Sequence, residues 1–371
     1  MMSEFRIVSL LPAATELIYE LGLGPQLVGR SHECDYPQAA RFLPVCSEPA
    51  YSLSGNAGDI HNTTSGVEAL SMFNLDLDLL KTLEPTHIVT QTQCDVCAVG
   101  KDELLSKTHD LFDYQVQLID FSPDSFPEYL DEIKMLSKQL NVSQNGHSLV
   151  QKFQKQIFRI QQKSAKALSK PSVAVLEWME PLIPAGHWNH DFMEIANIEN
   201  VFQDISKPVH FDKLTQADPD VLIIAPCGYP LKKIITDLTL LESKPGWDEL
   251  SAVKHGEVYL CDGNHLFNRP GSRLIDTLEI IAEICHPELF PVTRRYRDYV
   301  SYSSLLEEWT ANTSEEIERD KSEKFIPGRD YYINSGGKYV FTGYYLLSRG
   351  YCCKNACLHC PYGYFGPPKR L

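Results

Sequence analysis

The feature that most constrains the fold of this chain is a regular alternation of short apolar runs with amphipathic segments. Runs such as FRIVSLL (5–11), THIVTQT (86–92) and VQLIDFS (116–122) are bounded by turn residues, which is typical of buried strands. Segments with helical periodicity separate these runs. Alternating strands and helices predict βαβ units and a parallel sheet, because parallel neighbours need a crossover connection.

The alternation occurs twice along the chain. Between the two series, residues 123–170 show helical periodicity only, which predicts one long helix or two helices joined end to end. The strand–helix rhythm then returns with SVAVLEW, DVLIIAP and EVYLCDG and closes with the helix RLIDTLEIIAEIC. We therefore predict the α/β class, with two parallel-sheet lobes (5–122 and 171–290) joined by a long helical spine (123–170).

Two local predictions concern the edges of these elements. The segment ELIYELGL is predicted to be a helix capped by Thr15 at its start and ended by Gly22. The segment GHWNHD (186–191), which follows the first strand of the second lobe, is predicted to be a loop.

The C-terminal part differs in character from both lobes. Residues 291–325 are charged and polar and are predicted to be a linker. Residues 326–371 are predicted to form a small Cys-rich module, in which DYYINSGGKYVF has the turn residues and flanking runs of a β-hairpin. Its candidate metal ligands are Cys352, Cys353, Cys357 and Cys360, with His359 as a substitute. Four soft ligands close in sequence suit zinc or an iron–sulfur centre, whereas packing without metal remains the alternative.

Composition and charge argue against several classes of partner. The net charge of −15 disfavours nucleic acid, whose recognition needs clustered Lys and Arg. The longest apolar runs are too short for a transmembrane helix, so no stable membrane insertion is expected. The start has no basic segment followed by a long apolar one, which leads us to expect a cytoplasmic protein. In that compartment the 11 cysteines are thiols, metal ligands or redox groups rather than disulfides.

The strand ends are unusually rich in Cys, His and aromatic residues. Open parallel sheets bind ligands beyond the carboxyl ends of their strands, so these residues would line one cleft if the two lobes face each other. The alternative is that each is an isolated packing residue. The candidate ligand-binding residues are Thr15, Glu16, His32, Cys34, Cys94, Cys97, His187, Trp188, His190, Cys227, His265, Phe267 and Arg269.

Two of these groups favour particular chemistry. Cys94 and Cys97 form a CxxC between a strand and a helix, where half of a metal site, a redox dithiol and two buried thiols all remain open interpretations. Trp188, placed between two histidines, and Phe267 offer flat apolar walls for a planar macrocycle. The sequence contains no P-loop, no HExxH and no GxSxG motif, and it shows no convincing acid/base pair.

Several segments resemble a known family. RIVSLLPAATELIYELGLGPQLVGRSHECDYP resembles the opening of the substrate-binding proteins that serve ABC importers of vitamin B12 and iron–siderophores. DVLIIAP, EVYLCDGN and RPGSRLIDTLEIIAEICHPE are similar to the closing segments of that family, so the resemblance covers roughly residues 5–290. TQTQCDVCAVG, GHWNHD and DGNHLFNRPGSR resemble a cobalamin-binding branch, and the tail resembles a Cys-rich domain of unknown function. The resemblance implies a class III periplasmic-binding-protein-like fold with a ligand held between its lobes and no chemistry performed.

Two functional hypotheses follow. The first is non-catalytic, intracellular binding of a cobalamin-like corrinoid or another metal chelate, in which a thiolate or an imidazole coordinates the metal of the ligand. The second is a metal- or thiol-dependent redox enzyme that uses Cys94 and Cys97 together with the C-terminal cysteines. In both cases a small molecule is the expected ligand. A further alternative is a metallochaperone-like adaptor whose C-terminal tail only docks a partner, and the sequence does not identify that protein partner.

Overall fold

The computed structural model describes residues 5–49, 55–64, 73–91, 111–202, 206–292, 298–305, 331–333 and 339–341. The chain divides into two compact units, described separately below. The first contains residues 1–162, 190–195 and 269–278, and the second contains 163–189, 196–268 and 279–371. None of the helices in the described ranges combines the length and apolarity needed to cross a bilayer.

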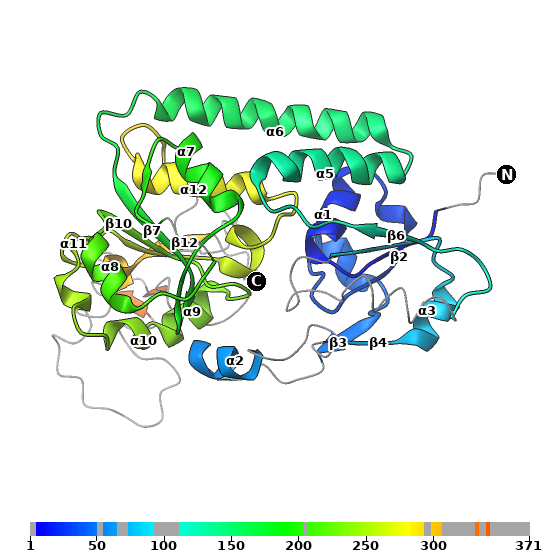
Figure 1. Cartoon of the computed structure of the whole chain (residues 1–371), viewed down its shortest axis with the longest axis horizontal. Helices are drawn as coiled ribbons and strands as arrows, with labels where there is room; N and C mark the ends of the chain where they lie inside the picture. The colour runs from blue at the N-terminus through cyan, green and yellow to red at the C-terminus, as the bar shows by residue number, and fades with distance from the viewer. Residues whose placement is uncertain are drawn as a thin grey trace. The chain divides into compact units, whose positions relative to one another are not determined.

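The first unit is built on a four-stranded parallel sheet in the order β2-β1-β5-β6, of which β2 and β6 are labelled in Figure 1. The central strands β1 (Ile7–Ser9) and β5 (His87–Thr90) are buried along their whole length, and β2 (Leu27–Arg30) and β6 (Gln117–Asp120) flank them. Strands β1, β5 and β6 lie within the predicted runs FRIVSLL, THIVTQT and VQLIDFS. The unit also contains an antiparallel pair, β3 (Ser47–Pro49) with β4 (Phe73–Leu75).

The first helix begins earlier than the sequence predicts. Helix α1 spans Pro12–Glu20, so Thr15 lies inside the helix and the prediction that it caps the helix is wrong. Pro12 accounts for this start, because its fixed φ suits the first turn and its missing N–H would have no intrahelical partner there. The predicted end is confirmed, since Gly22 has a φ of 82°.

Short helices complete the first unit. They are α2 (Ala57–Thr64), α3 (Leu77–Leu83) and two 3₁₀ turns, η1 (Gly24–Gln26) and η2 (Gln38–Phe42).

The predicted helical spine consists of two helices that fold back on each other. Helix α5 spans Phe126–Gln139 and α6 spans Ser143–Ser164, and the two lie side by side (Figure 1). Their contact is close at Gly146, where an added Cβ would lie 2.0 Å from Ser137 Oγ. The glycine therefore permits the chain to reverse, and the expectation of helices joined end to end is wrong.

The second unit is built on a mixed sheet in the order β12-β11-β10-β7-β8, with β9 (Glu199–Asn200) also pairing with β7. The three central strands are parallel: β7 (Ser172–Met179), β10 (Val221–Ile224) and β11 (Val258–Cys261). Antiparallel strands pair with both outer members of this set, β8 (Leu182–Pro184) with β7 and β12 (Tyr299–Ser301) with β11. Strand β12 lies in the segment that the sequence predicts to be a linker, so this part of the segment belongs to the sheet.

Helices connect the strands of the second unit as the alternation predicts. They are α8 (Phe211–Ala217), α9 (Leu231–Asp237), α10 (Thr239–Glu242), η4 (Trp247–Glu249) and α11 (Ser251–Lys254). A π-helical turn, η5 (Gly263–Phe267), follows β11. Helices α7 (Trp188–Ile195) and α12 (Leu274–Cys285) each contribute residues to both units. The prediction that GHWNHD is a loop is wrong in part, because α7 begins at Trp188.

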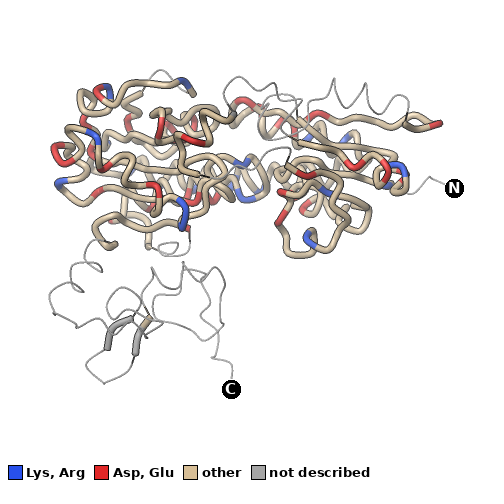
Figure 2. The backbone as a smooth tube through the Cα atoms, turned by 90° about the horizontal axis from the view of Figure 1, so that it is seen from below, with Lys and Arg blue, Asp and Glu red and all other residues tan. Residues whose placement is uncertain are grey.

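The last described strands, β13 (Tyr331–Ile333) and β14 (Tyr339–Phe341), pair antiparallel, as the predicted hairpin requires. Lys and Arg are scattered among Asp and Glu along the described backbone (Figure 2).

Candidate ligand-binding residues at the strand ends

A buried hydroxyl–thiol cluster lies at the carboxyl end of β1. Cys34 Sγ is fully buried and lies 3.0 Å from Thr15 Oγ1, which in turn lies 2.9 Å from Ser9 Oγ. Burial raises the pKa of the Cys34 thiol, which favours the protonated form. A protonated, enclosed thiol is a packing group, so this geometry disfavours Cys34 and Thr15 as direct ligand contacts.

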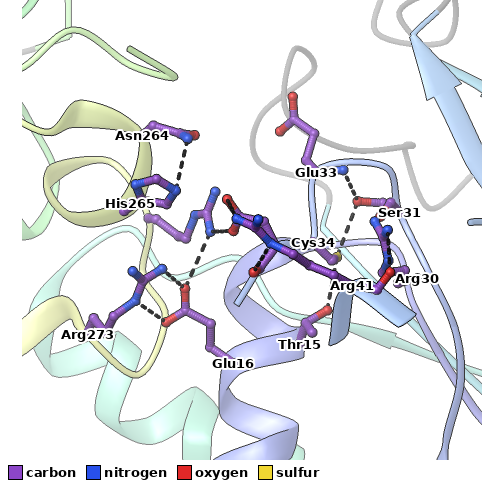
Figure 3. A network of polar contacts seen from close by, with 12 residues as sticks. Thr15, Glu16, Arg30, Ser31, Glu33, Cys34, Arg41, Asn264, His265 and Arg273 are labelled. Atoms are coloured by element: carbon purple, nitrogen blue, oxygen red, sulfur yellow. Dashed lines mark hydrogen bonds and ion pairs between the residues drawn. The ribbon is translucent and has the colours of Figure 1, made fainter. Parts of the chain in front are cut away.

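An ion cluster occupies the interior next to this site (Figure 3). Glu16 is only 1% exposed, and both of its carboxylate oxygens accept from Arg273, Oε1 from Nη2 at 2.5 Å and Oε2 from Nε at 3.2 Å. Arg269 Nη1 lies 3.5 Å from Glu16 Oε1 and donates to Asp35 Oδ1 at 2.7 Å. Buried charges are tolerated when they are paired in this way, so the cluster fastens Arg269 and Arg273 to α1 and to the loop after β2.

The segment between these two arginines fits tightly against the first unit. Ser272 Oγ donates to Glu16 Oε2 at 3.1 Å, and Tyr129 Oη donates to the carbonyl of Gly271 at 2.6 Å. A Cβ at Gly271 would lie 2.6 Å from Glu16 Oε2, which is shorter than the contacts that Cβ atoms make in proteins. The segment 269–273 is therefore held from two helices at once, α1 and α5.

The loop after β2 also positions His32. Its Nδ1 lies 2.9 Å from Ser47 Oγ, and its ring centroid lies 5.2 Å from that of Phe73. Burial lowers the pKa of the His32 imidazole and so favours its neutral form. Asp35 and Tyr36 in the same loop are missing from the sequence-predicted site, although Tyr36 lies 4.0 Å from the Arg273 guanidinium and is 41% exposed.

In the second unit, Trp188 and Phe267 pack inside the molecule. Trp188 Nε1 donates to the carbonyl of Phe267 at 2.9 Å, and the two residues are 7% and 0% exposed. This packing disfavours the interpretation of both rings as open walls for a macrocycle. His187, by contrast, is partly exposed and has a φ of 53°, and its ring lies 5.6 Å from that of Trp188. His190 is exposed in the first turn of α7 and belongs to the first unit.

The loops after β10 and β11 are locked together. Asn268 Nδ2 donates to the carbonyl of Ala225 at 2.8 Å, and the Gly263 N–H donates to the carbonyl of Tyr229 at 3.0 Å. A Cβ at Gly263 would lie 2.0 Å from the carbonyl oxygen of Pro226, so no larger residue fits there. Partly exposed Cys227 and His265 are thus presented on a rigid scaffold.

Two acidic residues of the second unit were missed by sequence reasoning. Glu177 Oε2 accepts from the Gly186 N–H at 3.2 Å, and burial raises the pKa of its carboxyl group. Asp262 accepts from the backbone N–H groups of Asn264 and His265 and from His265 Nδ1. In the sequence, each of these residues is an acid near the end of an apolar run, SVAVLEW or EVYLCD, and this position is the pattern that could have indicated them.

Several predicted residues lie outside the described residues: Cys94, Cys97, Cys352, Cys353, Cys357, His359 and Cys360. Within the described ranges, no group of three or more His, Cys, Asp or Glu side chains is arranged to hold a metal ion. The metal and CxxC predictions therefore stay predictions.

Two α/β units, each with parallel central strands and with polar loops at the strand ends, are typical of two-lobed ligand-binding proteins. A periplasmic binding protein family matches residues 7–264, and the chain belongs to this family. Residues 320–365 match a second family, which is described only as of unknown function. These matches confirm the resemblance at the level of the family and of the tail.

Named relatives agree with this assignment. An uncharacterized ABC transporter substrate-binding lipoprotein of Bacillus subtilis is 25% identical over 77% of this chain and 81% of its own length. A vitamin B12-binding protein of Vibrio cholerae is also 25% identical, over 75% of this chain and 87% of its own length. The cobalamin branch is thus only distantly indicated.

Solved structures share the fold. A possible iron-binding, periplasmic solute-binding protein of Staphylococcus epidermidis has a TM-score of 0.59 at 22% identity, covering 76% of this chain and 98% of its own. The haem complex of a Staphylococcus aureus protein has a TM-score of 0.57 at 19% identity, covering 76% and 100%. The predicted class III architecture, two α/β lobes with parallel sheets and connecting helices, is confirmed.

The expectation of a cytoplasmic protein is contradicted by these comparisons. The matching family is described as periplasmic, and the Bacillus relative is named as a lipoprotein of a transporter. The expectation rested on the character of the first residues alone, and the family assignment overrules it.

Proposed function

We propose that this protein binds a corrinoid or a similar planar metal chelate and releases it chemically unchanged. The observation that carries the proposal is the rigid pair of loops after β10 and β11, which presents Cys227 and His265 without further rearrangement. Pre-formed strand-end sites of this kind are typical of small-molecule binding proteins. The names of the relatives support the ligand class, because they include vitamin B12-binding and haem-bound proteins.

The first unit supports binding rather than catalysis. Glu16, Arg269 and Arg273 satisfy one another in the interior, so their role is to fix loops and not to exchange protons with a ligand. In the same unit, the side chains of Tyr36 and His32 are partly exposed. Both can contact a ligand without transferring a proton to it. A transporter partner is part of the proposal, because the Bacillus relative is a transporter's substrate-binding lipoprotein.

The test is retention of a coloured ligand. Purified full-length protein is mixed with cyanocobalamin, aquocobalamin or haemin and separated by gel filtration, and absorbance is read in the protein fraction. We expect stoichiometric retention of at least one of the three. Absence of all three chromophores from the protein fraction would refute the proposal.

A zinc or iron–sulfur centre in the C-terminal module is a separate part of the proposal, and the spacing of Cys352, Cys353, Cys357 and Cys360 is its only support. Elemental analysis of the full chain should find about one metal site, lost in Cys357→Ser and retained in the control Cys227→Ser. Equal metal content in both variants would exclude a metal ligand role for Cys357.

A further inference from the structure

Asp262 and His265 form a tightly organised carboxylate–imidazole pair at the end of β11. Asp262 Oδ1 accepts from the backbone N–H groups of Asn264 at 2.9 Å and of His265 at 2.7 Å. Its second oxygen, Oδ2, lies 3.0 Å from His265 Nδ1. One oxygen of the Asp262 carboxylate therefore caps the turn η5, and the other holds the imidazole ring of His265.

These contacts determine which ring nitrogen of His265 carries the lone pair. An ionised carboxylate only accepts hydrogen bonds, so Nδ1 must carry the proton. Nε2 is then the acceptor in the neutral ring, and Asn264 Nδ2 lies 3.3 Å from it, as a donor should (Figure 3). Both contacts fit this one tautomer. The side chain is 31% exposed, so a ligand can reach it.

Histidines that bind metals commonly have this arrangement. The second ring nitrogen donates to a carboxylate, which fixes the ring and makes Nε2 a stronger electron donor. The residues of η5 also form a π-helical turn, a geometry that is enriched at functional sites. Within the described ranges, His265 belongs to no group of three or more ligating side chains.

We infer that His265 Nε2 coordinates the metal of the bound chelate and that Asp262 is its positioning residue. The inference rests on the proposed function and specifies its chemistry: the ligand must have an exchangeable axial position. The Nε2–metal bond forms as a metal–water bond breaks, the water leaves, and no electron is transferred. The long contact from Asn264 Nδ2 is given up in the exchange.

Aquocobalamin is the probe, because its axial water exchanges with imidazole and the exchange changes the visible absorption spectrum. Cyanocobalamin is the comparison ligand, because its cyanide holds that position firmly. We expect the wild-type protein to retain both, with a spectral shift for aquocobalamin only. His265→Ala should retain cyanocobalamin and lose the shift, and added imidazole should restore it.

Two further variants sharpen this experiment. His255→Ala is the matched control, because His255 lies before β11, exposed, with Nδ1 2.9 Å from the carbonyl of Ser251, and it should behave as wild type. Asp262→Asn keeps an oxygen for the cap but cannot accept from Nδ1–H in the same way, and coordination should weaken about 10- to 100-fold. Circular dichroism of each variant checks that it folds.

The outcomes separate the inference from the proposed function. Retention of aquocobalamin by wild type without a spectral shift, or an unchanged shift in His265→Ala, would overturn the inference and leave the proposed function standing. Failure of wild type to retain any of the three chromophores would overturn both.

Discussion

The two units use carboxylates at their strand ends in opposite ways. In the first unit, Glu16 is buried and ion-paired with two arginines, and Asp35 joins the same network. In the second unit, Asp262 supports an imidazole that stays 31% exposed. A buried, satisfied network holds structure, whereas an accessible base with a fixed tautomer can act on a ligand. Residue type alone therefore does not separate scaffold from site.

The largest expected effect is on the buried network. Glu16→Ala removes the main partner of Arg273 and one of the two carboxylates beside Arg269 in a buried setting, so the free energy of unfolding should fall by about 3–5 kcal/mol. Urea denaturation of the full chain, followed by circular dichroism, measures this change. The matched control is Glu20→Ala on the same helix, whose 3.4 Å pair with Lys152 is exposed and should contribute less than about 1 kcal/mol. Similar losses for both variants would show that the network is not a structural anchor.

Alanine substitutions at two glycines, Gly263 and Gly271, test how rigid their surroundings are. In Gly263→Ala the new Cβ meets the carbonyl oxygen of Pro226, a backbone atom that cannot rotate away, so the loss should reach about 3 kcal/mol. In Gly271→Ala it meets the end of the Glu16 side chain, so the loss should be nearer about 1 kcal/mol. Denaturation midpoints rank the two variants. The reverse order would mean that the loops after β10 and β11 are the more yielding region.

The smallest expected change in stability concerns the buried carboxyl group of Glu177. Burial raises the pKa of Glu177 above its ordinary value of 4.5, so its contribution to stability is present below that value and is lost as pH rises through the folded-state pKa. Glu177→Gln keeps an acceptor for the Gly186 N–H. The variant should therefore gain stability relative to wild type at pH 8 but not at pH 4.5.

Thermal unfolding at both pH values checks this prediction, with Glu16→Gln as the contrasting variant. Because the Glu16 carboxylate is paired with arginines, that substitution should destabilise at pH 8. A pH-independent effect of Glu177→Gln would show that the Glu177 carboxyl group is not perturbed by folding.

The sequence by itself determined the class of fold. Apolar runs such as SVAVLEW and DVLIIAP lie where β7 and β10 form, because a strand buried on both faces must be continuously hydrophobic. It also indicated that Cys, His and aromatic side chains gather at the carboxyl ends of strands, which follows from the direction of parallel strands.

Only the tertiary structure shows which of these residues are buried and which are paired. Glu16 and Arg273 are 257 positions apart, so no local pattern could show that their charges neutralise each other. Two helices also differ from the prediction. Helix α1 begins at Pro12 rather than after Thr15, and Gly146 lets α6 fold back on α5. Cys34 and Phe267 are fully buried, which disfavours them as ligand contacts, and Asp262 Oδ2 lies 3.0 Å from Nδ1 of His265. Burial and pairing depend on contacts between distant segments, and a sequence read in local windows does not contain them.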